Sequence, residues 1–233
     1  MKQRWAALFL VLCMTLALTA CGGKAPADSG ESAPPQSAAS APTETPEISA
    51  PAEVGNILIA YFTADENREV DAVTSASLTT VDGTEKGRVR AVADMIAAET
   101  GGTLFSIQTS AGYPSDGGEL IDYAAEEQDQ NARPELTSQI EHLEDYDIIF
   151  IGYPTWWYDM PQVLYSFFDT YDFSGKTIIP FNVHNGSRFS GTISTIQELE
   201  PDAVVIEDGF TVSEKNVADA GADVTEWLRN LGF

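Results

Sequence analysis

Short apolar runs alternate with segments of helical periodicity over most of the chain. The runs lie at residues 56–61, 103–107, 147–152, 177–183 and 203–206. Their almost continuous apolar character is typical of strands buried on both faces of a parallel sheet. Apolar side chains at helical spacing extend from Val89 to Ala97, and a favourable cap follows at Gly101-Gly102. We expect the other helices at residues 118–131, 161–170, 191–199 and 213–231.

Five strands alternating with five helices predict the α/β class. Right-handed crossovers would place helices on both faces of a doubly wound, five-stranded parallel sheet, which gives a three-layer α/β/α sandwich. Ligands of such sheets bind beyond the carboxyl ends of the strands. Three loops follow strand ends there: the residues from Phe62 onward, residues 153–160 and residues 182–191.

The first twenty residues have the layout of a secretory signal. Lys2 and Arg4 precede an apolar run over residues 5–18, and Leu-Thr-Ala-Cys follows at residues 18–21. The run is shorter than the roughly 20 apolar residues of a membrane span, although a retained N-terminal anchor is the alternative. Leu-Thr-Ala-Cys resembles the lipobox of bacterial lipoproteins, in which the cysteine carries the lipid. We therefore expect a signal peptide at 1–20 and an extracytoplasmic protein anchored to the bacterial membrane by lipid on Cys21.

A tether is expected after Cys21. Residues 22–52 are rich in Ala, Pro, Ser, Thr and Glu, and Ile48 is their only large apolar residue. Such a segment cannot bury enough apolar surface to offset the entropy of ordering. The sequence thus predicts a lipid-anchored disordered linker at 21–53 and one folded domain at 54–233.

The charge balance excludes nucleic acid as a partner. The chain has 12 Lys and Arg against 36 Asp and Glu, so its net charge is −24, and a phosphate backbone would be repelled. The two cysteines are Cys13 and Cys21. Disulfides, cysteine metal sites and a cysteine nucleophile are therefore excluded from the predicted domain.

Two of the strand-end loops favour a planar ligand. Residues 153–160 include Tyr153, Trp156, Trp157 and Tyr158, and a heteroaromatic ring could stack on them. The alternative is that the tryptophans plug the top of the core. Residues 182–191 hold glycines and small polar residues, which direct backbone N–H groups toward a ligand but also form ordinary turns. His184 could serve there as an acid, a base or a hydrogen-bond donor.

Residues 54–233 resemble the flavodoxin family, in particular its subgroup of bacterial lipoproteins. The similarity lies at residues 57–63, 132–136, 146–157 and 171–181, with Gly-Tyr-Pro-Thr-Trp-Trp and Asp-Phe-Ser-Gly-Lys as its most specific parts. The resemblance implies a flavodoxin-like sheet of order 2-1-3-4-5 and non-covalent FMN, with the phosphate on the first loop. By the same resemblance one set of residues would flank the flavin ring on one side: Pro154, Thr155, Trp156, Trp157 and Tyr158. The other side would be lined by Asn182, His184, Asn185 and Gly186.

The expected phosphate loop departs from the family pattern. Thr63 begins it correctly, but about twenty residues intervene before Gly87, which fits the family's glycine. Arg88 stands in place of Asn and Val89 in place of Thr, so a hydroxyl donor is lost. Arg88, and Lys86 with it, could supply a cation instead. Arg88 could equally be an exposed helix residue.

The inserted stretch permits a second mode of attachment. Residues 70–77 weakly resemble a motif at which FMN is joined through its phosphate in another exported flavoprotein family, with Ser77 at the acceptor position. A polar surface loop explains the same residues.

The resemblance implies an FMN-dependent electron carrier or oxidoreductase. The predicted domain carries about −22 by sequence, which would favour stronger reducing power and docking to a basic face of a redox partner. We expect that unidentified partner to be a membrane-bound reductase. A flavin-free ligand-binding lipoprotein on the same scaffold is the alternative. A hydrolase is disfavoured, because Gly-x-Ser-x-Gly, His-Glu-x-x-His and Walker motifs are missing from the sequence.

Overall fold

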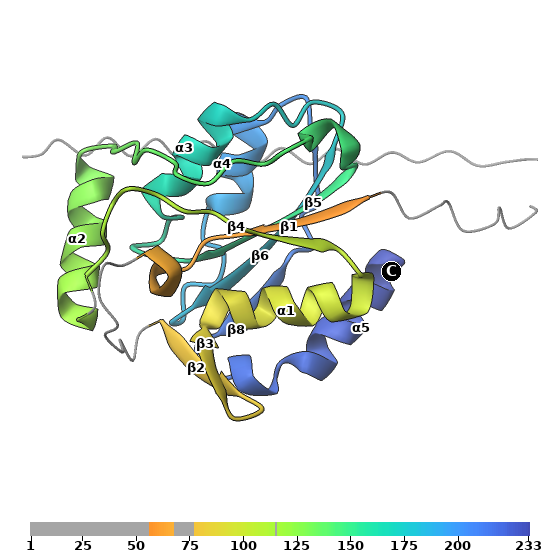
Figure 1. The fold of residues 1–233 in the computed structure, drawn as a ribbon, viewed down its shortest axis with the longest axis horizontal. Coiled ribbons are helices and arrows are strands. Elements are labelled where there is room, and N and C mark those ends of the chain that lie inside the picture. The colour runs from red at the N-terminus through yellow and green to blue at the C-terminus, as the bar shows by residue number, and fades with distance from the viewer. Residues whose placement is uncertain (1–55, 68–76, 115) are drawn as a thin grey trace, which may run out of the picture. The chain divides into compact units, whose positions relative to one another are not determined.

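A parallel sheet forms the centre of the described part of the chain (Figure 1). The structure is a computed structural model, and it describes residues 56–67, 77–114 and 116–233. The sheet order is β4-β1-β5-β6-β7, with β8 also paired to β6, and every neighbouring pair is parallel. The strands are β1 (Ile57–Tyr61), β4 (Thr103–Ser106), β5 (Ile148–Pro154), β6 (Thr177–His184), β7 (Val204–Val205) and β8 (Phe210–Ser213). The predicted order 2-1-3-4-5 is confirmed.

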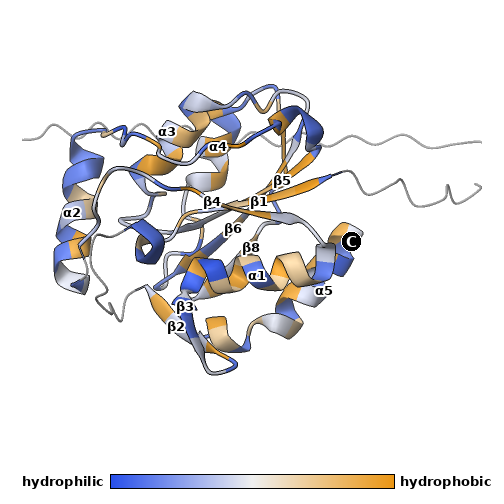
Figure 2. Cartoon of the chain, viewed as in Figure 1, coloured by the Kyte–Doolittle hydropathy of each residue, from blue (hydrophilic) through white to orange (hydrophobic). Residues whose placement is uncertain are grey.

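Helices cover both faces of this sheet, as the predicted three-layer sandwich requires (Figure 1). Alternate residues of β1 point to opposite faces, so Ile57 and Ile59 join the core under α1 and α5, whereas Leu58 and Ala60 join the core under α2, α3 and α4. Figure 2 shows apolar residues along the strands and on the covering helices. The helices are α1 (Arg88–Thr100), α2 (Gly117–Asp129), α3 (Gln162–Thr170), α4 (Thr192–Leu199) and α5 (Gly221–Leu231), with short 3-10 turns η1 (Ala64–Asn67), η2 (Leu143–Asp145) and η3 (Val217–Asp219).

The fifth position of the sheet differs from the prediction. Two short strands share it: β7 pairs with the start of β6, and β8 pairs with its end. The helix expected over residues 213–231 is therefore wrong in its first part, because Ser213 ends β8 and α5 begins only at Gly221. Phe210 and Val212 are buried at period 2, which is the pattern of a strand.

A hairpin that the sequence did not predict precedes α1. It consists of β2 (Leu78–Val81) and β3 (Thr84–Gly87), joined by a turn in which Asp82 and Gly83 both have positive φ. Such turns match the twist of antiparallel strands, and Asp-Gly suits them. The pairing of Leu78 with Gly87 brings Ser77 to the start of α1, where its carbonyl accepts a hydrogen bond from the Arg88 N–H at 2.8 Å.

Several predictions fall on parts of the chain outside the described residues. These are the signal peptide at 1–20, the linker at 21–53 with Cys21, and residues 70–76 of the weak covalent-attachment motif. In the described ranges, no helix is both long enough and apolar enough to cross a membrane.

Candidate functional site

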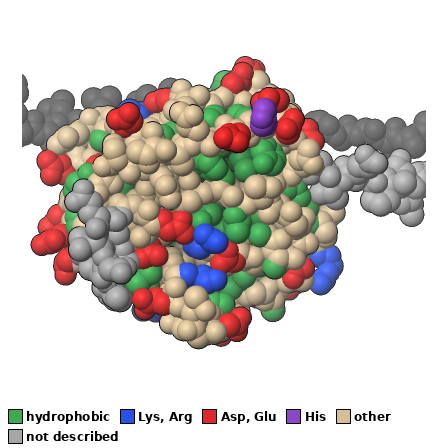
Figure 3. Space-filling model, in the orientation of Figure 1, with side chains coloured by type: hydrophobic (Ala, Val, Ile, Leu, Met, Phe, Trp, Pro, Cys, Tyr) green, Lys and Arg blue, Asp and Glu red, His purple; other side chains and the backbone are tan. Residues whose placement is uncertain are grey.

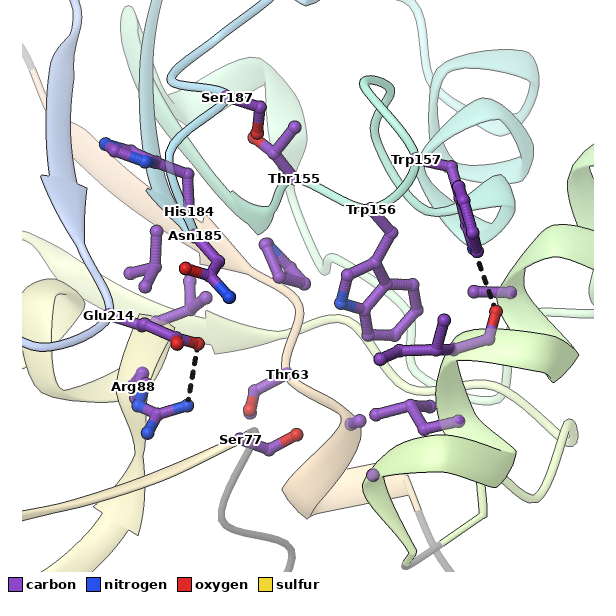
Figure 4. Close-up of a pocket in the computed structure, with 18 of the residues that line it drawn as sticks. Thr63, Ser77, Arg88, Thr155, Trp156, Trp157, His184, Asn185, Ser187 and Glu214 are labelled. Carbon is purple, nitrogen blue, oxygen red and sulfur yellow. Dashed lines mark hydrogen bonds and ion pairs between the residues drawn. The ribbon is translucent and has the colours of Figure 1, made fainter.

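A cavity of about 870 Å³ opens beyond the carboxyl ends of β1, β5 and β6 (Figure 4). Its volume lies within the range of roughly 300–1,000 Å³ typical of small-molecule sites. The three predicted loops meet here, as the rule for parallel sheets requires. Ten of the predicted site residues line it: Thr63, Arg88, Pro154, Thr155, Trp156, Trp157, Tyr158, His184, Asn185 and Gly186.

The aromatic loop makes a tight turn at the rim of the cavity. Trp156 and Asp159 exchange two backbone hydrogen bonds of 2.9 Å, and the two residues between them, Trp157 and Tyr158, have φ of 48° and 65°. Left-handed backbone is unfavourable for bulky side chains, and such strain persists only where the surrounding structure enforces it. The indole N–H of Trp157 donates to the Ile121 carbonyl at 2.8 Å, which ties the turn to α2 (Figure 4).

The two tryptophans of this loop have different environments. Trp156 packs against Phe62 and Tyr113, with ring centroids 5.8 and 5.7 Å away, and also lines the cavity. Trp157 is 49% exposed, and Tyr158 is 73% exposed. Core packing therefore explains why an aromatic residue occupies position 156, at least in part. It does not explain the exposed aromatic side chains of Trp157 and Tyr158.

The third loop supplies a neutral imidazole. His184 Nδ1 accepts a hydrogen bond of 2.8 Å from the Gly186 backbone N–H. Burial, reinforced by the charge of Arg188 and opposed by that of Glu214, lowers the pKa of His184. Because Nδ1 is the acceptor, the neutral ring carries its proton on Nε2 and can donate it.

Asn182 does not line the cavity, contrary to the prediction for this residue. It is fully buried in β6, and its side-chain amide donates to Thr155 Oγ1 and, at 2.8 Å, to the Arg188 carbonyl. The Thr155 hydroxyl donates to the same carbonyl at 2.8 Å. Asn182 thus joins the second loop to the third and positions them, rather than contacting a ligand.

The opposite end of the cavity is formed by the start of α1. Gly87 is the N-cap residue, no side chain caps the helix, and the first turn contains no acidic residue. A helix N-terminus of this kind favours an anion. Gly87 itself does not line the cavity but lies beneath Thr63: a Cβ on Gly87 would be 2.5 Å from Thr63 Oγ1. The glycine therefore permits the first loop to approach the helix.

Arg88 is a cavity residue and not an exposed helix residue. Its side chain is only 15% exposed, and its Nη1 lies 3.3 Å from Glu214 Oε2. Lys86, the other expected cation, pairs with Asp94 at 2.6 Å and does not line the cavity. Ser77 lines the cavity near Thr63 (Figure 4), so a hydroxyl from the inserted segment is present where Val89 lacks one.

Several residues that line the cavity were not among the site residues predicted from the sequence. Ser187 lies within a predicted loop, whereas Glu214 follows the unpredicted strand β8. The wall opposite the third loop comes from the start of α2, and only tertiary packing brings it there. Its residues are Asp116, Gly117, Gly118, Leu120, Ile121 and Ala124.

Comparison with known proteins gives a family and a fold. Residues 83–231 match the family model described as Flavodoxin. Candidate flavoproteins of Bacteroides eggerthii and Bacteroides uniformis are 24% and 26% identical, with TM-scores of 0.58 and 0.57; the alignments cover 76% and 75% of this chain and 98% of each structure. A Lactobacillus acidophilus flavoprotein in complex with FMN is 19% identical, with a TM-score of 0.51 over 72% of this chain and 99% of that one. No curated protein matches the sequence.

Proposed function

Because the chain belongs to the flavodoxin family, we propose that it binds FMN non-covalently and transfers electrons outside the cytoplasm, held at a membrane by lipid on Cys21. The FMN complex of the Lactobacillus acidophilus protein supports the choice of ligand. Electrons would pass to or from a redox partner, for which a membrane-bound reductase is our choice, because free nicotinamide cofactors are expected to be scarce outside the cytoplasm.

The observation that carries the proposal is that the two ends of the cavity differ in chemistry. One end has aromatic side chains and loop backbone, and the other has Arg88 and the uncapped start of α1. FMN has a flat heteroaromatic ring at one end and a phosphate at the other. The described residues therefore fit FMN in chemistry and in volume.

Each end of the cavity would have its own role. Trp156, Trp157 and Tyr158 would cover the ring and exclude water, while the His184 Nε2–H would donate to an acceptor at the ring edge. Thr63, Ser77 and Arg88 would hold the phosphate through their side chains. The N–H groups of the first turn of α1 that follow Arg88 would assist, since the Arg88 N–H itself donates to the Ser77 carbonyl. Bound FMN supplies the capacity to take up and release electrons, and the protein tunes the potential.

Titration of the purified protein with FMN tests this function. We expect flavin absorbance bands to co-purify or to appear on reconstitution, with tryptophan fluorescence quenched as the ring covers Trp156 and Trp157. Absence of quenching at millimolar FMN would contradict the proposal and favour the flavin-free ligand-binding alternative. Release of flavin by acid precipitation would support non-covalent binding, and flavin retained through precipitation would instead indicate attachment at a residue such as Ser77.

The membrane part of the proposal rests on the N-terminal sequence and has a separate test. Cells that express the wild type should retain the protein in the membrane fraction, outside the cytoplasm, whereas Cys21→Ser should release it or leave its signal uncleaved. Ser at position 21 cannot form the thioether to lipid. A wild type that keeps the full mass of residues 1–233, with no lipid attached, would argue for a retained apolar anchor instead.

A further inference from the structure

We propose that Glu214 is a specificity-determining residue of this cavity: paired with Arg88, its carboxylate lowers the preference for a phosphorylated flavin over the same flavin without phosphate. This inference rests on the proposed function, because it concerns the phosphate end of the flavin site. It assigns to Glu214 a role opposite to that of Arg88, although both residues belong to one ion pair.

The backbone fixes Glu214 at the edge of the sheet. Its N–H donates to the His184 carbonyl at 2.8 Å, immediately after the last paired residue of β8. From there its Oε2 lies 3.3 Å from Arg88 Nη1 (Figure 4), with side-chain exposures of 24% for Glu214 and 15% for Arg88. The pair is therefore largely removed from water, where charges interact more strongly than at an open surface.

The carboxylate opposes an incoming phosphate in two ways. A phosphate monoester carries a charge of about −1.5 to −2 near neutral pH, so it is repelled by Glu214. It must also share the Arg88 guanidinium with a carboxylate that already neutralises it. A flavin that lacks the phosphate has an uncharged hydroxyl at this end and meets neither cost.

The other charged or titratable groups that line the cavity do not offset the repulsion between Glu214 and a phosphate. Among the described lining residues, Asp116 is the other carboxylate, and its Oδ1 accepts hydrogen bonds from the Gly118 N–H at 2.8 Å and the Glu119 N–H at 3.1 Å. It is thereby occupied in capping α2. His184 has a lowered pKa and is neutral at pH 7. Preference for phosphate thus depends on the balance between Arg88 with α1 on one side and Glu214 on the other.

The test is the ratio of affinities for FMN and riboflavin in the full chain, measured by fluorescence quenching at low salt. Glu214→Gln removes the charge but keeps an amide oxygen that can accept from Arg88. We expect this variant to bind FMN about three- to tenfold more tightly, with riboflavin affinity changed less than twofold. Glu226→Gln, at an exposed position of α5 outside the cavity, alters the net charge equally and should leave the ratio unchanged.

A second variant keeps the inference testable if Glu214→Gln folds poorly. Arg88→Gln leaves the carboxylate without this guanidinium, so FMN should bind more weakly than riboflavin. An FMN-to-riboflavin ratio that stays at the wild-type value in Glu214→Gln, or falls there, would overturn the inference while the proposed function stood. If the wild type bound neither flavin, the proposed function would be wrong, and this inference with it.

Discussion

Trp156 and Trp157 are neighbours in sequence, but they are expected to respond differently to truncation. Trp157→Ala should weaken FMN binding by about 1 kcal/mol or more through lost stacking. Its effect on unfolding should be limited to about 1 kcal/mol, because the side chain is half exposed and truncation removes mainly the hydrogen bond to the Ile121 carbonyl. Trp156→Ala should lower the free energy of unfolding by about 2–4 kcal/mol, because its indole packs on Phe62 and Tyr113. Urea unfolding and FMN titration of both variants give the comparison. Unchanged FMN affinity in Trp157→Ala would show that the exposed ring does not stack on the flavin.

Glu127 makes the stability of the fold depend on pH. It is only 7% exposed, and burial raises the pKa of its carboxyl to about 7, although a hydrogen bond from Tyr113 partly opposes the shift. In the unfolded chain the Glu127 carboxyl should lose its proton near the ordinary pKa of 4.5. Between those two values the folded state binds more protons, so stability falls as pH rises from about 4.5 to 7 and is then flat.

Glu127→Gln should remove this dependence. We expect the variant to match the wild type near pH 4.5 and to be more stable by about 1–3 kcal/mol at pH 8, as measured by urea unfolding across that range. Glu200, whose pKa burial also raises to about 7, is unchanged in both proteins, so the difference between them isolates Glu127. A constant difference at all pH values would mean that the carboxylate does not titrate in this window.

At the scale of elements, the sequence predicted the strands and helices whose own residues show a clear apolar pattern. The strands β1, β5 and β6 are continuous apolar runs, and the inward face of α1 repeats at helical spacing. β8 was missed because four residues with alternate burial are too few to stand out, and they adjoin a helical pattern. The β2–β3 hairpin was missed because its residues are mainly polar.

The candidate site was predictable to a similar extent. Loops after parallel strands must meet at one edge of the sheet, so residues 154–158 and 183–187 could be brought together from sequence alone. Glu214 could not, because it depends on β8. The α2 wall could not either, since no local pattern specifies which helix face closes a cavity. Asn182 was assigned to ligand contact because its loop was recognised, although its burial makes it a positioning residue.

Gly87 and Gly221 both lie at the start of a helix, and comparing alanine variants of the two tests how closely the first loop approaches α1. An added Cβ at Gly87 would be 2.5 Å from Thr63 Oγ1, whereas at Gly221 it would meet nothing within 4 Å. Gly87→Ala should therefore cost about 1–3 kcal/mol of stability and weaken FMN binding, because Thr63 must move. Gly221→Ala should be neutral or stabilise by up to about 1 kcal/mol. Thermal unfolding and FMN titration measure both effects, and equal behaviour of the two variants would contradict a tight contact at Thr63.

Over the whole molecule, negative charge greatly exceeds positive charge. Residues 54–233 carry 9 Lys and Arg against 31 Asp and Glu. On the face shown in Figure 3, acidic side chains are spread around the rim, and several basic ones lie beside acidic neighbours, as do Lys86 and Arg90 beside Asp94. The long-range field at the cavity is therefore negative, which disfavours adding an electron to bound flavin.

Screening this field should raise the reduction potential of bound FMN. The Debye length falls from about 30 Å at 0.01 M salt to about 3 Å at 1 M, so distant carboxylates act on the cavity only at low salt. We expect the potential to rise on the order of 50 mV across that range, about a tenfold change for one electron. A spectroscopic redox titration measures it, with free FMN in the same salt series as the control. A potential that follows free FMN at every salt concentration would mean that the local groups Arg88, Glu214 and His184 outweigh the charge of the rest of the molecule.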